Sequence, residues 1–301
     1  MPFPETLSKN PKVIFFTDFD GTITQKDTND YITDNHGFGL EQRRHGNQLI
    51  LDGTLSFRDG FQQMIDSWQV SLTKMIEILE KNISLDPYFK DFVVWAKKHD
   101  MPIVVLSSGM VPVIAALLRK LLGEDLMQDI EIIANDAKKV PPINDLSKKG
   151  GWNIEFHDES SFGHDKSLTI RPYADAIAQM PKGQFRPTLL YAGDGVSDLS
   201  AARETDLLFA KAGHDLITYC EREGIPFTTF EDWQSILDET KKIWSGETSV
   251  KNVAEEGLVR HRTNSIEAQK RPQSGAFNRK MSLSQQQKPL VTEETPPGAR
   301  Q

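Results

Sequence analysis

The chain has 301 residues, of which 38% are hydrophobic and 26% are charged, and its formal net charge is −8. These values are typical of a soluble protein with one large domain, or with one domain that carries an insertion. The acidic balance argues against a nucleic-acid surface as the main function, and a single cysteine, Cys220, excludes an intramolecular disulfide or a cysteine metal cluster within one chain.

The chain contains no apolar run of transmembrane length, and residues 1–5 lack the basic and apolar regions of a signal peptide. We therefore expect a cytoplasmic protein, with the nucleus as a further location. We expect neither a membrane nor a nucleic acid as its partner.

The first predicted strand, residues 13–16, is an apolar run that suits a strand buried on both faces. Asp18 and Asp20 follow it, and Gly21 lets the chain leave the strand sharply. Two acids at the end of a buried strand imply a cation, a shared proton or catalytic use. The alternative is an Asx-rich turn that caps the next helix.

The segment that follows is predicted to be mainly helical. Residues 24–44 are polar and indicate a loop with a short helix, whereas apolar residues recur at helical spacing from Phe57 onward. The two amphipathic stripes consist of Phe61, Met64, Ile65 and Trp68, and of Leu72, Met75, Ile76 and Leu79.

Five more apolar runs predict strands that alternate with helices: residues 103–106, 130–134, 189–192, 207–210 and 227–230. This order predicts an α/β fold, a mostly parallel sheet with helices on both faces. Residues 152–156 alternate as in an antiparallel strand and suggest a hairpin on that sheet. Residues 246–301 are poor in large apolar side chains and predict a disordered tail, in which Ser282 is a candidate for phosphorylation and the tail itself a candidate for binding a partner.

Polar residues that suit phosphoryl transfer follow three of the strands. Asp18 could attack phosphorus, and Asp20 could protonate the leaving alcohol and then activate water. Asp194 could join Asp18 in holding a magnesium ion, because hard oxygen ligands suit that cation. Ser107 offers a hydroxyl to the phosphoryl oxygens, and Lys166 would offset the negative charge.

Four motifs carry a resemblance to a known family: Asp-Phe-Asp-Gly-Thr, the strand-end serine, the lysine and Gly-Asp-Gly-Val-Ser-Asp, in that order. The chain resembles the haloacid dehalogenase-like phosphatases, and within them the phosphoserine-phosphatase branch and a group of fungal phosphatases near it. The resemblance implies a Rossmann-like core over residues 1–21 and 87–245. It also implies a helical cap of the C1 type over residues 22–86, followed by the tail.

The resemblance further implies roles for single residues. Asp18 would be the nucleophile and Asp20 the general acid and base, with Lys166 as the third catalytic residue. Magnesium would be held by Asp18, Asp194, Asp198 and the backbone carbonyl of Asp20, and Asp198 would also orient the lysine or the metal-bound waters. The substrate-binding residues would be Ser107, Ser108, Gly109, Asp27 and Arg58. Gln62 stands where the phosphoserine branch has an arginine, so phosphoserine is disfavoured as substrate.

The expected function is magnesium-dependent hydrolysis of a small phosphomonoester, a phosphorylated metabolite, through an aspartyl-phosphate. One alternative is a phosphotransferase or mutase that uses the same intermediate. The other is a regulatory protein that kept the fold without the catalysis.

Overall fold

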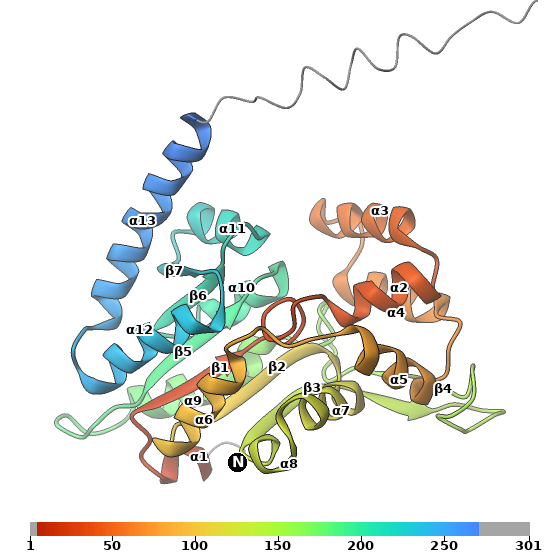
Figure 1. Ribbon diagram of the computed structural model, residues 1–301, viewed down its shortest axis with the longest axis horizontal. Helices are drawn as coiled ribbons and strands as arrows, with labels where there is room; N and C mark the ends of the chain where they lie inside the picture. Colours follow the sequence, from red (N-terminus) through yellow and green to blue (C-terminus); the bar gives the residue numbers. More distant parts are fainter. Residues whose placement is uncertain (1–4, 271–301) are drawn as a thin grey trace, which may run out of the picture. The chain divides into compact units, whose positions relative to one another are not determined.

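The computed structural model describes residues 5–270, and residues up to Val259 belong to its first compact unit. A sheet with the strand order β4-β3-β2-β1-β5-β6-β7 lies at the centre of this unit (Figure 1). All neighbouring strands are parallel except β3 and β4, which form the predicted antiparallel pair. The prediction of a mostly parallel α/β fold is confirmed. The strands are β1 (Val13–Thr17), β2 (Ile103–Met110), β3 (Ile130–Lys139), β4 (Trp152–Glu155), β5 (Thr188–Gly193), β6 (Leu207–Lys211) and β7 (Phe227–Phe230).

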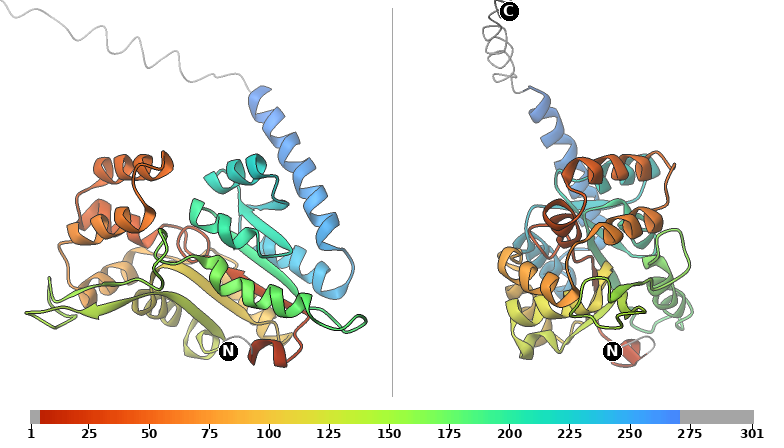
Figure 2. Two further views of the ribbon diagram at one scale, coloured as in Figure 1. Left: turned by 180° about the vertical axis from the view of Figure 1, so that it is seen from behind. Right: turned by 90° about the vertical axis from the view of Figure 1, so that its right-hand side faces the viewer.

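Helices cover both faces of the sheet, as Figure 1 and the view from behind in Figure 2 show. Along β1, Val13 and Phe15 enter one hydrophobic core while Ile14 and Phe16 enter the other, because successive side chains of a strand point to opposite faces. The first core is shared with α6 (Phe89–Lys98), α7 (Val111–Leu122) and α12 (Trp233–Ser245). The second core is shared with α9 (Lys166–Ala178), α10 (Leu199–Ala202) and α11 (Asp215–Glu223). Shorter helices are α1 (Glu5–Ser8), α8 (Glu124–Met127) and the 3₁₀ turn η1 (Val196–Asp198).

Four helices lie between β1 and α6 in the chain: α2 (Thr28–His36), α3 (Leu40–Leu51), α4 (Phe57–Ser67) and α5 (Leu72–Asn82). The apolar stripes of α4 and α5 are largely buried. Residues 24–44 contain more helix than their polar composition predicted. Asp27 explains the start of α2, because its carboxylate accepts hydrogen bonds from the backbone N–H groups of Asn29 and Asp30.

The chain enters and leaves this helical segment at one place. Thr24 forms an isolated antiparallel bridge with Leu85. The backbone N–H of Asp86 donates to the carbonyl of Ile23 at 2.8 Å, and that of Gln25 donates to the carbonyl of Ser84 at 3.0 Å. The two crossings are thus paired as a short ribbon.

The prediction of disorder from residue 246 does not hold for residues 250–270, which form α13 (Val250–Lys270). Within the first unit, Val253 is buried and Gly257 lies against Thr228 of β7, where an added Cβ would come within 2.5 Å of the threonine hydroxyl. A few small or apolar contacts therefore dock a helix whose overall composition is polar. From Arg260 onward the residues belong to a second unit, and Ser282 lies outside the described residues. In the described part of the chain no helix combines the length and the apolarity that a membrane span requires.

Candidate active site

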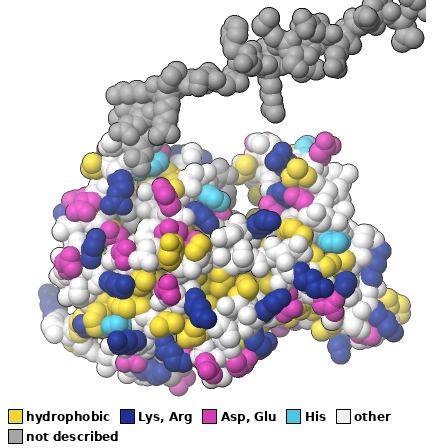
Figure 3. Space-filling view, viewed as in Figure 1, with side chains coloured by type: hydrophobic (Ala, Val, Ile, Leu, Met, Phe, Trp, Pro, Cys, Tyr) yellow, Lys and Arg dark blue, Asp and Glu magenta, His cyan; other side chains and the backbone are white. Residues whose placement is uncertain are grey.

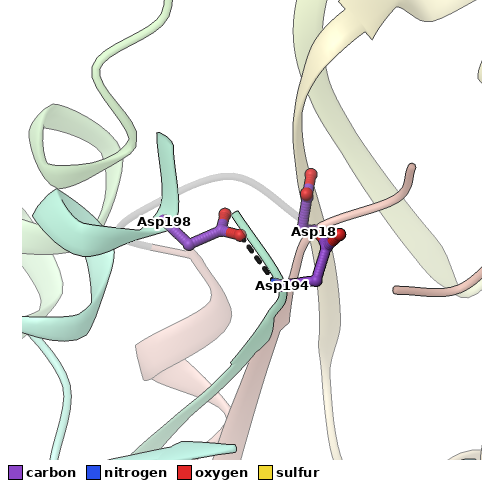
Figure 4. A group of neighbouring side chains, drawn as sticks. All are labelled: Asp18, Asp194 and Asp198. Atoms are coloured by element: carbon purple, nitrogen blue, oxygen red, sulfur yellow. Dashed lines mark hydrogen bonds between the residues drawn. The ribbon is translucent and has the colours of Figure 1, made fainter. Parts of the chain in front are cut away.

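The predicted acids meet at the carboxyl ends of neighbouring strands. Asp18 follows β1 and Asp194 follows β5, and their side chains lie beside each other, while Asp198 approaches from the next turn of the chain (Figure 4). One carboxylate oxygen from each of the three lies within 4.8 Å of the other two. The parallel pairing of β1 with β5 explains this meeting, because it brings the two strand ends to the same edge of the sheet.

Lys166 joins this cluster from the first residue of α9, and its side chain is completely buried. Its Nζ lies 2.9 Å from Oδ1 of Asp18 and 2.5 Å from Oδ1 of Asp198. Burial alone would lower the pKa of Lys166, but the two carboxylates outweigh it and raise that pKa above its ordinary value. The lysine therefore stays positively charged beside Asp18.

Asp198 is fully buried and all of its contacts are internal. Its Oδ1 accepts from Lys166 and from the hydroxyl of Tyr191, each at 2.5 Å, and its Oδ2 accepts from the backbone N–H groups of Asp194 and Gly195 at 3.0 Å. A carboxylate with four donors has no oxygen free to bind a metal directly. The structure thus places Asp198 as the residue that orients Lys166 and the turn after β5, which agrees with one of its two expected roles, whereas its four donors do not favour the other role, as a metal ligand.

Sequence patterns do not single out Tyr191 as a site residue, because it lies within the apolar run of β5, which indicates a core position. A signal was present: a tyrosine in a strand that is buried on both faces needs a hydrogen-bond partner for its hydroxyl.

Asp18 and Asp194 remain as the acids that could hold a cation. Burial and the negative charges of Asp198 and Asp194 raise the pKa of Asp18 well above its ordinary value, even though Lys166 opposes them. Asp194 accepts a hydrogen bond from the Thr22 hydroxyl at 3.1 Å, and its other oxygen lies 3.1 Å from Nδ1 of His214. The positive charge of Lys166 offsets only part of the negative charge of the three acids, and Asp18 and Asp194 present carboxylate oxygens beside each other, so these residues fit a hard divalent cation.

Asp20 faces the helical segment rather than the other acids. Its Oδ1 accepts from the backbone N–H of Thr28 at 2.8 Å, and its Oδ2 accepts from the side-chain amide of Asn29 at 3.0 Å. Burial outweighs the hydrogen bonds from Thr28 and raises the pKa of Asp20 to about 6. Asp20 is therefore a carboxyl group that can both carry and release a proton near neutral pH.

The end of β2, where the strand is irregular between Ser107 and Met110 and which we call the serine turn, lines the same cavity as these acids. Ser107 is buried and its Oγ accepts from the N–H of Gly109 at 2.9 Å, while the Oγ of Ser108 is buried without a hydrogen-bond partner. An added Cβ on Gly109 would lie 3.1 Å from Oδ2 of Asp20, so this close approach favours glycine. The turn thus presents two hydroxyl groups to the site.

A family model described as haloacid dehalogenase-like hydrolase matches residues 15–203, which is more than half of the chain. The chain belongs to the haloacid dehalogenase-like hydrolases. This confirms the resemblance that the four motifs indicated.

Individual relatives of this hydrolase are close over nearly their whole length. A Schizosaccharomyces pombe protein named Pdp3-interacting factor 1 is 49% identical over 238 residues, which are 79% of this chain and 99% of that protein. A Saccharomyces cerevisiae protein named polyol phosphate phosphatase PYP1 is 45% identical over 245 residues, 81% of this chain and 99% of its own. A solved structure of a substrate-bound phosphoserine phosphatase is similar with a TM-score of 0.53 at 17% identity, covering 76% of this chain and 98% of its own, and shows the shared fold alone.

In this haloacid dehalogenase-like hydrolase, the acids and the serine turn line one side of a cavity of about 240 Å³. The other side is lined by residues of the inserted helices: Asp27, Asn29, Asp30, Asn47, Ile50, Leu51, Phe57, Phe61 and Met64. The space-filling view shows the surface hollowed beside α3, with acidic and basic side chains mixed over this face (Figure 3). The wall opposite Asp18 therefore combines acceptor groups with apolar side chains.

The structure brings Asp27 to this cavity but not Arg58. Phe57, Phe61 and Met64 of α4 face the cavity, so the neighbouring Arg58 points to another side of the helix. Its Nη1 donates to the carbonyl of Asp158 at 2.6 Å. The expected role of Arg58 as a substrate-binding residue does not agree with this position. Among the described residues that line the cavity, none carries a cationic side chain.

Proposed function

We propose that this hydrolase is a magnesium-dependent phosphatase that cleaves a small phosphomonoester through an aspartyl-phosphate. The observation that carries the proposal is the distance of 2.9 Å between Lys166 Nζ and Asp18 Oδ1, at the carboxyl end of the central strand. The family and the S. cerevisiae relative, whose name states a phosphatase, support it.

Each residue has a chemical task in this proposal. Oδ of Asp18 attacks phosphorus, and the P–O bond to the alcohol breaks as Asp20 delivers its proton to the leaving oxygen. Asp20 then takes a proton from water, which attacks the aspartyl-phosphate and releases inorganic phosphate. Lys166 keeps its positive charge beside Asp18 throughout. Magnesium, when bound by Asp18, Asp194 and the backbone carbonyl of Asp20, would supply further positive charge next to the phosphate.

The inserted helices, over residues 22–86, act in this proposal as a cap that selects the leaving group. The cap wall offers the carboxylates of Asp27 and Asp30 and the amides of Asn29 and Asn47, together with apolar side chains. Carboxylates accept hydrogen bonds from hydroxyl groups and repel a carboxylate of the substrate. The name of the S. cerevisiae relative says that it acts on polyol phosphates. We therefore propose an uncharged, hydroxylated leaving group, and we disfavour phosphoserine.

The test is phosphate release from a panel of esters with magnesium or with EDTA. We expect the highest kcat/KM for phosphates of small polyols such as glycerol, a much lower value for phosphoserine, and loss of activity in EDTA. A preference for phosphoserine would contradict the proposed leaving group, and no release from any ester would contradict the phosphatase. Phosphate transfer to an added alcohol in place of release would favour the phosphotransferase. The S. pombe relative is named for an interaction, but the retained Asp18, Asp20 and Lys166 favour catalysis over a purely regulatory protein.

A further inference from the structure

The loop that connects β4 to α9, residues 156–165, contacts α4 of the cap through one residue in particular. Arg58 donates from Nη1 to the carbonyl of Asp158 at 2.6 Å, and from its backbone N–H to the carbonyl of Ser161 at 2.9 Å. Its guanidinium also lies over the ring of Phe156, 4.4 Å from the ring centroid. This arginine, which does not reach the substrate cavity, therefore binds the cap to the loop.

The loop is braced internally. The carboxylate of Asp158 accepts from the N–H of Ser160 at 2.8 Å and from the N–H of Asp165 at 2.7 Å. Gly163 has a φ of 72°, and an added Cβ would overlap the ring of Phe156, so only glycine fits there. Because the two ends of the loop are tied by the same aspartate, a displacement at Asp158 is passed on to Asp165.

The far end of the loop contacts the catalytic groups. His164 is completely buried, and its Nδ1 donates to the carbonyl of Ser107 at 2.8 Å. Asp165 caps the N-terminus of α9 by accepting from the N–H of Ser167, and Lys166 is the first residue of that helix. The loop thus supports both the serine turn and the lysine.

We propose that residues 156–165 link the position of the cap to the geometry of the phosphate site, with Arg58 and His164 as positioning residues at the two ends. With Arg58 in place the loop holds the Ser107 turn and Lys166 toward Asp18, and movement of α4 away from the loop releases them. The inference rests on the proposed function in one respect, namely that Ser107 and Lys166 bind the phosphate group of the substrate.

The first experiment measures amide hydrogen exchange of the full chain without substrate. Arg58→Met keeps the length of the side chain but removes the guanidinium donors, so we expect faster exchange across residues 157–165. Gln62→Leu is the matched control. Gln62 lies one turn further along α4 and donates to Asn153 of β4 and to Asp66, so exchange in the loop should not change.

The second experiment measures inhibition by inorganic phosphate. Arg58→Met and His164→Leu should each weaken it by about 2- to 30-fold, the usual range for coupling between sites, while Arg58→Lys recovers part of the loss and Gln62→Leu has no effect. The double variant should lose less than the product of the two single losses, because both residues act through one loop. If His164→Leu does not fold, His164→Gln serves in the same cycle.

Unchanged exchange in Arg58→Met, or independent effects of the two substitutions on phosphate inhibition, would overturn the proposal. Hydrogen exchange is measured without substrate and therefore does not depend on catalytic activity. If the wild-type protein hydrolysed no phosphate ester, the proposed function would fail while the exchange experiment would still decide whether Arg58 orders the loop.

Discussion

Tyr191 donates its hydroxyl to Oδ1 of Asp198 at 2.5 Å, and the same oxygen accepts from Lys166. The tyrosine lies on β5 and the lysine begins α9, so Asp198 joins these two elements beside Asp18. The position of Lys166 relative to Asp18 consequently depends on a residue in the apolar centre of the sheet.

Removal of this hydroxyl should weaken both stability and catalysis. We expect Tyr191→Phe to lower the free energy of unfolding by about 1–3 kcal/mol, the usual contribution of a buried hydrogen bond to a charged group, and to reduce kcat more than it changes KM. Urea denaturation and steady-state kinetics measure the two effects. Tyr88→Phe, at a tyrosine that is 38% exposed, should change neither, and wild-type values for Tyr191→Phe would contradict the role of this contact.

Asp18→Asn and Asp20→Asn should fail at different steps. Asp18→Asn lacks the nucleophile and should lose about four orders of magnitude in kcat or more, with any substrate. Asp20→Asn keeps the nucleophile, so an aryl phosphate, whose leaving group needs no proton, should still phosphorylate the enzyme. Rapid-quench measurement should then show a burst of aryl alcohol equal to the enzyme concentration, followed by slow turnover. A linear time course at the wild-type rate would refute the assignment of Asp20.

Magnesium should stabilise the protein through Asp194. A ligand at a concentration of 100 times its Kd stabilises the folded state by about 2.7 kcal/mol, so saturating magnesium should raise the thermal midpoint and EDTA should reverse the shift. Asp194→Asn should abolish most of this shift, whereas Asp136→Asn, at an exposed acid on β3, should retain it. An equal shift in both variants would show that the cation binds elsewhere.

His164 should make stability depend on pH. Burial, which outweighs the hydrogen bond to Ser107, lowers the pKa of His164 from 6.5 to about 4, with Lys166, His157 and Asp158 as its charged or titratable neighbours. Because the folded protein binds this proton less readily than the unfolded chain, the stabilisation is complete above pH 6.5. It is lost as the pH falls from 6.5 toward 4, by up to about 3 kcal/mol.

Urea unfolding at pH 7.5 and at pH 4.5 tests this dependence. His164→Gln should lose less stability between the two pH values than the wild-type protein does. The control His45→Gln, at an exposed histidine, should follow the wild type. Parallel behaviour of all three proteins would mean that His164 is not kept neutral by the fold.

The sheet could be predicted from sequence because its strands are apolar runs that end in turn residues, as at residues 13–16 and 189–192. Local patterns were also sufficient for α4 and α5, whose apolar residues recur at helical spacing. Local patterns were insufficient for α13. This helix is docked by the buried Val253 and by the contact of Gly257 with Thr228 of β7, and two such residues produce no periodic apolar pattern in a polar segment.

The acids and the lysine of the site could be found because their residue types are costly to bury without a task. The direction of the Arg58 side chain could not be predicted from the sequence. On α4, a shift of one residue decides whether a side chain faces the cavity, as Phe57 does, or the loop at Asp158, as Arg58 does. The two partners of Asp20 in the cap, Thr28 and Asn29, likewise became evident only once α2 was placed. Such contacts join residues whose relation is set by the packing of whole helices.

The paired crossing at Thr24 and Leu85 makes the helical segment exchangeable as a unit. Because both ends of the segment meet in one short ribbon, a different insert with adjoining ends could be spliced there without moving β1 or α6. Asp18 and Asp194 follow strands of the core and would keep their places, whereas Asp20 would lose its partners Thr28 and Asn29 and the loop of residues 156–165 would lose Arg58. A new insert would therefore have to replace these contacts as well as the cavity wall, so a change of the wall would also change the support of Asp20 and of that loop.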